Sequence, residues 1–382
     1  MNKRKQKFEQ SGFHANRSNV SAQTLSPAGL VNVRISRRQF FGAGLTAAAV
    51  ILLDGCSTVA ELAHPNHAPV ETAPDCGNTH AHSKQVSALS VHPDGKTLFS
   101  GGNDETVKIW SHPDGAHVKT LSGHSDTVFS LAVSPDGKHL FSSSADRTIR
   151  IWTLPEGTLA RTLTGHSDRV RVMAVSHDGK WLASGSFDRT VKLWSIPDGT
   201  LAQTLAGDTD WVTSLAFTPC GTKLISGYHD QTIVVWNISD GSVLQKWNRE
   251  PGAIVSLSVT PDGKRLITGN CNGVIKIRSL TDGLVLKALK AHAYSVNAIV
   301  LTPDGNRFVS ASADETIKLW DLTKGRLIKT VIQKDAVHVL SLSPDGKLLV
   351  SGESSGAIKL WDMQEISSPK CLLHAENVSK MK

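Results

Sequence analysis

Residues 123–163 read GHSDTVFSLAVSPDGKHLFSSSADRTIRIWTLPEGTLARTL. Four short runs rich in apolar residues lie within this stretch: Val128–Val133, His139–Ser144, Thr148–Leu154 and Leu159–Leu163. The Ser-Pro-Asp-Gly segment between the first two runs is typical of a tight turn, because Pro fixes φ and Gly adopts a positive φ. The stretch therefore predicts one small sheet of four strands joined by short turns.

The same unit recurs along the 382 residues at a nearly constant period. Its turn glycines, spaced by 42 residues and finally by 41, are Gly95, Gly137, Gly179, Gly221, Gly263, Gly305 and Gly346. The tryptophans Trp110, Trp152, Trp194, Trp236, Trp320 and Trp361 follow the same grid, and Arg278 stands where one is missing. A lone sheet of this size cannot bury both faces, so the seven copies are expected to stack on one another.

The ends of the units carry a further pattern. Gly-His, or Ala-His, precedes the first strand and Trp-Asp ends the third, as in Gly123-His124, Gly165-His166, Ala291-His292, Trp320-Asp321 and Trp361-Asp362. In these features residues 82–375 resemble the WD-repeat (WD-40) family. The resemblance implies an all-β fold, a seven-bladed β-propeller of four-stranded antiparallel blades closed into a ring.

The resemblance also implies a hydrogen-bonded tetrad of His, Ser, Asp and Trp within a blade. Four units carry it complete: His82, Ser100, Asp104 and Trp110; His124, Ser142, Asp146 and Trp152; His166, Ser184, Asp188 and Trp194; His292, Ser310, Asp314 and Trp320. Because the Ser-His-Asp set recurs beside a Trp, we interpret it as structural and not catalytic. The fourth unit departs at Asp208, the fifth at Glu250, Asn272 and Arg278, and the seventh at Gln333 and Ser355. We therefore expect blade five to be the least protected.

Partners of the family commonly dock on the rim formed by the entry loops and the corners between the second and third strands. On this grid, blades two to four place six large or charged residues there: Phe129, Arg169, Arg171, Phe187, Trp211 and His229. Aromatic and arginine side chains are enriched at binding hot spots, and arginines receive carboxylates. The sequence thus predicts a protein partner with an acidic, apolar segment. The alternative is that Phe129 and Phe187 only fill the central channel.

The amino-terminal segment has the features of an export signal. Arg37 and Arg38 precede Phe40–Leu53, an apolar run of 14 residues that is shorter than the roughly 20 needed to span a bilayer. The pair resembles a twin-arginine signal, which predicts a signal peptide over residues 1–55. Cys56 resembles a lipid-bearing cysteine, although Asp54 departs from the usual pattern. We expect an exported, membrane-anchored lipoprotein facing the periplasm or cell surface; the alternative is cleavage near residues 60–68 to a soluble form.

Residues 56–84 are rich in Pro, Ala and His and are expected to form a flexible tether before a propeller over residues 85–375 and a tail over residues 376–382. The tether offers an alternative metal site at His64, His67, Cys76 and His80, although the spacing matches no structural zinc pattern. Residues 367–373 are expected to supply the outer strand of blade seven. Ring closure would then bring Cys76 and Cys371 to one seam, as a disulfide or as two thiols. Cys220 and Cys271 are expected on opposite rims, unpaired.

The distribution of charge excludes one function class. The chain has a net charge of +7, but eight basic and two acidic residues lie within residues 1–55, so the remainder carries only +1. A domain without a basic patch is not expected to bind nucleic acid. No phosphate loop or isolated nucleophile stands outside the repeats, so we predict no enzyme and no cofactor. A non-enzymatic scaffold of the bacterial cell envelope is favoured; a metal-binding lipoprotein and a channel-binding small-ligand protein stay as alternatives.

Overall fold

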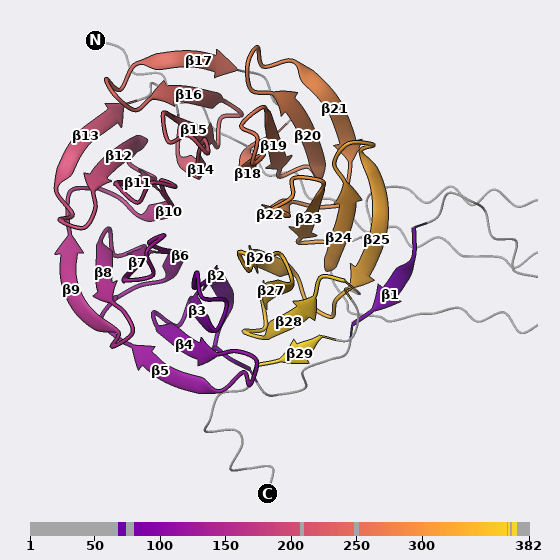
Figure 1. Cartoon of the computed structure of the whole chain (residues 1–382), viewed down its shortest axis with the longest axis horizontal. Helices are drawn as coiled ribbons and strands as arrows, with labels where there is room; N and C mark the ends of the chain where they lie inside the picture. The colour runs from indigo at the N-terminus through magenta and orange to yellow at the C-terminus, as the bar shows by residue number, and fades with distance from the viewer. Residues whose placement is uncertain are drawn as a thin grey trace, which may run out of the picture. The chain divides into compact units, whose positions relative to one another are not determined.

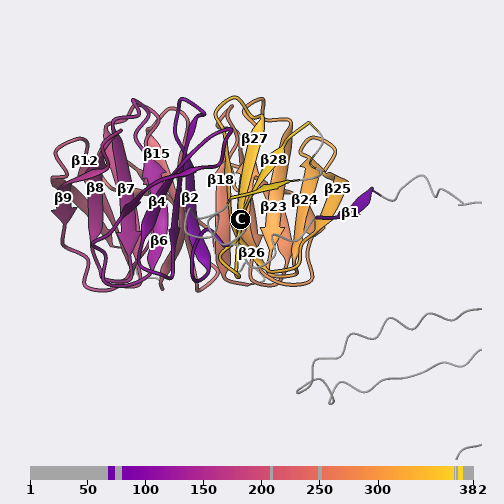
Figure 2. The same cartoon turned by 90° about the horizontal axis from the view of Figure 1, so that it is seen from below.

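Seven β-sheets surround a common axis in the computed structural model, which describes residues 68–73, 80–206, 210–247, 252–364, 366 and 369–372 (Figure 1). Six sheets have four strands and one has five, and within each repeat unit the strands pair in sequence order and antiparallel. The predicted all-β, seven-bladed propeller is confirmed. Seen from the side, the strands run between two rims of the ring (Figure 2).

Each blade runs from an inner strand at the axis to an outer strand at the periphery. The inner strands are β2 (Val86–Val91), β6 (Val128–Val133), β10 (Val170–Val175), β14 (Val212–Phe217), β18 (Ile254–Val259), β22 (Val296–Leu301) and β26 (Val337–Leu342). The second strands are β3 (Thr97–Gly102), β7 (His139–Ser144), β11 (Trp181–Ser186), β15 (Lys223–Tyr228), β19 (Arg265–Asn270), β23 (Arg307–Ser312) and β27 (Leu348–Glu353).

The remaining two strands of each blade lie farther from the axis. The third strands are β4 (Val107–Ser111), β8 (Ile149–Thr153), β12 (Thr190–Ser195), β16 (Ile233–Asn237), β20 (Val274–Ser279), β24 (Thr316–Asp321) and β28 (Ile358–Asp362). The outer strands are β5 (His117–Leu121), β9 (Thr158–Leu163), β13 (Leu201–Ala206), β17 (Val243–Trp247), β21 (Val285–Lys290), β25 (Arg326–Ile332) and β29 (Lys370–Cys371).

The core lies between the blades. The described residues form seven clusters of buried apolar side chains, and each cluster draws on two adjacent blades. Glycine permits the close approach at several seams: a Cβ on Gly101 of β3 would lie 2.6 Å from Cγ1 of Val128 in the next blade. Each blade is therefore stabilised by apolar contacts with the two blades beside it, as expected for stacked repeats.

The ring closes between blades seven and one. β29 pairs with β28, so the tail supplies the outer strand of blade seven as predicted. From this strand Lys370 donates to the carbonyls of Pro113 at 2.9 Å and Asp114 at 2.6 Å in blade one. Cys371 is disulfide-bonded, while Cys220 and Cys271 are free. Cys76, its predicted partner, lies outside the described residues, so that pairing stays a prediction.

One strand was not expected. β1 (Val70–Thr72) lies within the segment predicted as a tether and pairs parallel with β25, where it forms the fifth strand of blade six (Figures 1 and 2). Glu71 Oε1 of β1 forms an ion pair with Lys329 Nζ of β25 at 2.9 Å, which adds a side-chain contact to the strand pairing. Ala81 and His82 are buried, so the propeller begins before residue 85. Arg37, Arg38 and Cys56 lie outside the described residues. Among the residues that are described, no helix is long and apolar enough to span a membrane.

Candidate functional site

One rim of the ring, here called the entry-loop rim, is formed by the loops before the inner strands and the corners between second and third strands. A backbone hydrogen bond joins loop to corner in each blade, as from Phe187 N to Arg169 O at 3.0 Å and from His229 N to Trp211 O at 3.0 Å. The bond places the residue before each Asp position beside the third residue after each His position. Phe187 and Arg169 of blade three therefore lie on the same rim as His229 and Trp211 of blade four.

The predicted tetrads hold this rim in four blades. In blade three, His166 Nδ1 donates to Asp188 at 2.7 Å, its Nε2 accepts from Ser184 Oγ at 2.8 Å, and Trp194 Nε1 donates to the same hydroxyl at 2.8 Å. Asp188 also accepts from the backbone N–H of Ser167, which ties the entry loop to the corner. Equivalent bonds link the tetrads of blades one, two and six.

The environment of the tetrad favours an ionised carboxylate. Burial alone would raise the pKa of the Asp188 carboxyl, but hydrogen bonds from His166 and Thr190 more than offset it, so this pKa lies well below the ordinary range. The carboxyls of Asp104, Asp146 and Asp314 behave in the same way. These carboxylates are hydrogen-bonded to groups of their own blade, as a structural role requires.

Other side chains replace the tetrad in blades four and seven. In blade four Ser226 Oγ donates to the buried Tyr228 hydroxyl at 3.1 Å and accepts from Trp236 Nε1 at 2.7 Å. In blade seven Lys359 forms a buried ion pair with Glu353 at 2.7 Å and donates to Gln333 at 2.9 Å. The sequence signal was present: Tyr228 and Glu353 stand at equivalent strand positions where blades two, three and six have Ser.

Five of the six predicted rim residues form two groups. Phe187 and Trp211 stack across the seam of blades three and four, with ring centroids 4.5 Å apart and planes 14° apart. His229 lies against Trp211 at 5.2 Å, and its Nδ1 is 3.2 Å from Asp210. We call Phe187, Trp211 and His229 the aromatic patch. Trp211 is 42% exposed although it is among the largest apolar side chains, which is typical of a binding residue.

Arg171 and Phe129 form the second group, inside the ring. The Arg171 guanidinium lies over the Phe129 ring, 5.1 Å from its centroid. Both line a cavity of about 180 Å³ to which every blade contributes, which we call the channel mouth. Phe129 therefore belongs to the channel, as the alternative interpretation had it, and Phe187 belongs to the rim. Arg169 is exposed, and its backbone carbonyl accepts from the amide of Phe187 in the aromatic patch.

A comparison with family models gives the same division of the chain. The model for the WD domain, G-beta repeat, matches residues 75–111, 115–153, 157–195, 199–237, 241–279, 283–321 and 325–362. The chain belongs to this family. No curated protein matches the sequence. From the second onward, each matched WD repeat begins near the outer strand of one blade and ends at the third strand of the next, so successive repeats interlock neighbouring blades.

The opposite end of the WD-repeat channel has a different lining. There one turn residue from each blade surrounds a cavity of about 720 Å³: Pro93, Pro135, His177, Pro219, Pro261, Pro303 and Pro344. The ring is nearly all proline because the same turn recurs in every repeat. It offers apolar surface and only one titratable side chain, His177, from these turn positions.

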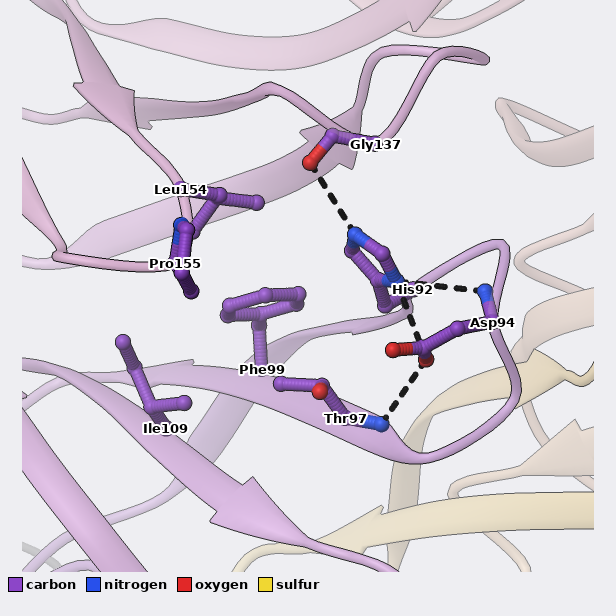
Figure 3. A pocket seen from close by; sticks show the side chains of 8 residues that line it. All are labelled: His92, Asp94, Thr97, Phe99, Ile109, Gly137, Leu154 and Pro155. Carbon is purple, nitrogen blue, oxygen red and sulfur yellow. Dashed lines mark hydrogen bonds and ion pairs between the residues drawn. The ribbon is translucent and has the colours of Figure 1, made fainter.

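A smaller hollow lies on the same rim between blades one and two, above Phe99 and Ile109 (Figure 3). Its polar groups are satisfied from within: His92 Nε2 donates to the Gly137 carbonyl at 3.0 Å, and His92 Nδ1 accepts from Asp94 N at 3.1 Å. The histidine thus joins the turns of two blades. A hollow whose donors are already used has little means of selecting a polar ligand.

The described residues include no group of His, Cys, Asp and Glu side chains that could hold a metal. Of the alternative metal ligands only His80 is described; His64, His67 and Cys76 lie outside the described residues. The structure therefore brings forward two surfaces with binding character, the aromatic patch and the channel mouth.

Proposed function

We propose that this chain is a non-enzymatic scaffold of the bacterial cell envelope that binds another protein through the aromatic patch. WD-repeat propellers are typically protein-interaction scaffolds, and the patch is the observation that carries the proposal. A stacked Trp–Phe pair offers a large, rigid apolar surface whose ordering costs little conformational entropy on binding.

The chemistry around the patch indicates the partner. Arg169 is exposed beside it, and Arg171 lies in the channel mouth of the same blade. Arginine beside aromatic surface suits a segment that combines apolar side chains with carboxylates. The partner we propose is an envelope protein with such an acidic, apolar segment.

The envelope location rests on the sequence alone. Arg37 and Arg38 precede a short apolar core, and Cys56 follows it directly. We propose export by the twin-arginine route, which carries folded cargo, and anchoring through lipid on Cys56. Growth with labelled palmitate tests the anchor: label is expected on the wild-type chain and absent from Cys56→Ala. Label retained in that variant would exclude Cys56 as the carrier.

Cross-linking and capture from native membranes test the binding face. We expect a partner captured by the wild-type chain to be lost from Phe187→Ala/Trp211→Ala, because removal of one hot-spot side chain costs about 2 kcal/mol or more, roughly 30-fold in affinity. Tyr294→Ala is the matched control: Tyr294 is an aromatic residue 65% exposed in the entry loop of blade six.

Each variant is first compared with the wild-type chain in thermal unfolding, since the patch is exposed and its loss should leave the fold intact. Equal capture by the double variant would move the binding face elsewhere. If Tyr294→Ala also loses the partner, the binding surface extends around the rim and is not confined to the aromatic patch.

A further inference from the structure

Arg171 is a cation for which the described residues provide no hydrogen-bond acceptor. It projects from β10 into the channel mouth, and its guanidinium forms no hydrogen bond and no ion pair with any residue that the structure describes; its recorded contact is with the Phe129 ring. Burial lowers the pKa of this guanidinium, and no nearby carboxylate opposes the shift. Because arginine stays protonated in proteins, the channel mouth holds an uncompensated positive charge.

Arg171 is half-buried, whereas the buried lysines and arginines among the described residues all have an acceptor. Lys108 donates to the Ala81 carbonyl at 2.7 Å, Lys192 to Thr204 at 3.0 Å and Arg278 to the Gly283 carbonyl at 2.9 Å. Lys359 is paired with Glu353. Desolvated charges are costly unless they are hydrogen-bonded or paired, and each of these four cations has a hydrogen-bond acceptor. Arg171, which has no acceptor among the described residues, lies in a cavity open to solvent.

Arg171 is the only arginine or lysine among the described residues that line the channel mouth, and the Ser214 hydroxyl of the same lining also has no hydrogen-bond partner there. No Asp or Glu is among the described residues that line it. The polar side chains of Ser87 and Asn297 already donate to the carbonyls of Val128 and Val337 in the following blades, at 2.6 and 2.9 Å. His338, also in the lining, has a lowered pKa because of its burial and the charge of Arg171, so it adds no second cation at neutral pH.

One cation in a confined space selects one negative charge. A carboxylate carries a single charge and accepts two parallel N–H bonds from guanidinium. Phosphate carries more than one charge near neutral pH and would leave the excess uncompensated. A volume of about 180 Å³ is ample for a carboxylate group and several waters.

We propose that the channel mouth is a carboxylate-binding site in which Arg171 binds the anion, with the Phe129 ring as one wall. The carboxylate is supplied by an acidic side chain of the protein that docks on the aromatic patch, or by a small free carboxylate. The first source rests on the proposed function, and the second does not.

The test uses the full-length chain in detergent and sodium acetate as the probe. Thermal unfolding is followed while acetate replaces chloride at constant ionic strength, so that general salt effects are shared by all variants. We expect acetate to raise the unfolding midpoint of the wild type and of Arg326→Gln, a control in which the lost arginine is 66% exposed on the outer strand of blade six. Arg171→Gln should bind acetate at least about tenfold more weakly.

A second readout protects the test against a variant that folds poorly. The ¹³C resonance of labelled acetate should broaden with wild-type protein and with Arg171→Lys, which keeps the charge, and not with Arg171→Gln. Equal responses of wild type and Arg171→Gln in both measurements would overturn the proposal. An acetate-induced rise in the unfolding midpoint that persists unchanged in Arg171→Gln would also overturn it, because acetate would then bind elsewhere.

Capture of a protein partner separates the two sources. If Arg171→Gln loses both acetate and the partner, the carboxylate belongs to the partner. If it loses acetate and keeps the partner, a free carboxylate is the ligand. If acetate binds and no partner is captured by any variant, the carboxylate site stands and the proposed scaffold function falls. If acetate does not bind while Trp211→Ala still loses the partner, the proposed scaffold function stands and the carboxylate site falls.

Discussion

The ion pair that replaces the tetrad in blade seven can be tested by removing one charge at a time. Lys359 Nζ lies 2.7 Å from Glu353 Oε1, and the two side chains are 1% and 2% exposed. Gln333 also accepts from the ammonium at 2.9 Å. Glu353→Gln leaves an ammonium with neutral acceptors, and Lys359→Met leaves a buried carboxylate whose ammonium partner is gone.

The expected cost follows from this burial. Removing one partner of a buried pair costs about 3–5 kcal/mol in unfolding free energy, because the remaining charge is desolvated and uncompensated. Replacing both charges costs far less, since such pairs are often neutral against uncharged side chains of similar volume. The double variant Glu353→Gln/Lys359→Met should therefore be no less stable than either single variant, with a coupling energy of at least about 3 kcal/mol.

Denaturant unfolding followed with two independent probes gives the unfolding free energy of the wild type, the two single variants and the double variant. The comparison is made only where the two probes give the same transition, because a ring of repeats can unfold in parts. Lys180→Met is the control: Lys180 pairs with Asp178 at 3.4 Å, with side chains 74% and 45% exposed, and should change stability by about 0–1 kcal/mol. Single variants that cost less than about 1 kcal/mol, or costs that simply add, would refute the buried pair.

Three further predictions concern single blades. Hydrogen bonds from the Thr218 and Thr222 hydroxyls lower the pKa of the Cys220 thiol to about 7, so its alkylation by iodoacetamide, followed by mass spectrometry, should be half-maximal near pH 7; a midpoint above pH 8 would contradict it. The folded-state pKa of Asp188 lies below its unfolded value, so its contribution is complete above about pH 5 and is lost as the pH falls toward the folded pKa; Asp188→Asn should flatten the loss of the unfolding midpoint between about pH 5 and 2. Blade five has no tetrad, so amides of β18 and β19 should exchange faster than those of β10 and β11; equal rates would exclude the expectation.

The repeat made the fold predictable, because its period placed the turns, the strands and the tetrads on one grid. In the second unit the predicted strand over residues 139–144 coincides with β7, and the inner strand coincides with β6. Turn chemistry explains this accuracy: Ser134 donates to Asp136 at 2.6 Å and Gly137 has φ +73°, so the local sequence fixes the chain reversal without help from distant contacts.

The grid predicted which rim a residue occupies, but not its depth or its partner. Phe129 and Phe187 were both predicted to lie on the same rim, yet one lines the channel and the other stacks on Trp211. The place of Tyr228 inside blade four depends on a packing space that no single repeat reveals. β1 lies outside the repeats, where no period was available to predict its pairing with β25.

The closing seam shows how a ring can be completed by packing instead of strand exchange. A Cβ on Gly352 of blade seven would lie 2.6 Å from Cγ1 of Val86 in blade one, which repeats the approach of Gly101 to Val128 at an internal seam. The His82 amide donates to the Gly356 carbonyl at 3.1 Å across the same seam. Since the first and last blades meet with the geometry of any other pair, the short β29 is not required to define the interface. Its contacts through Lys370 instead tie the outer strand of blade seven to the Pro113–Asp114 turn of blade one, and Cys371 of the same strand is disulfide-bonded.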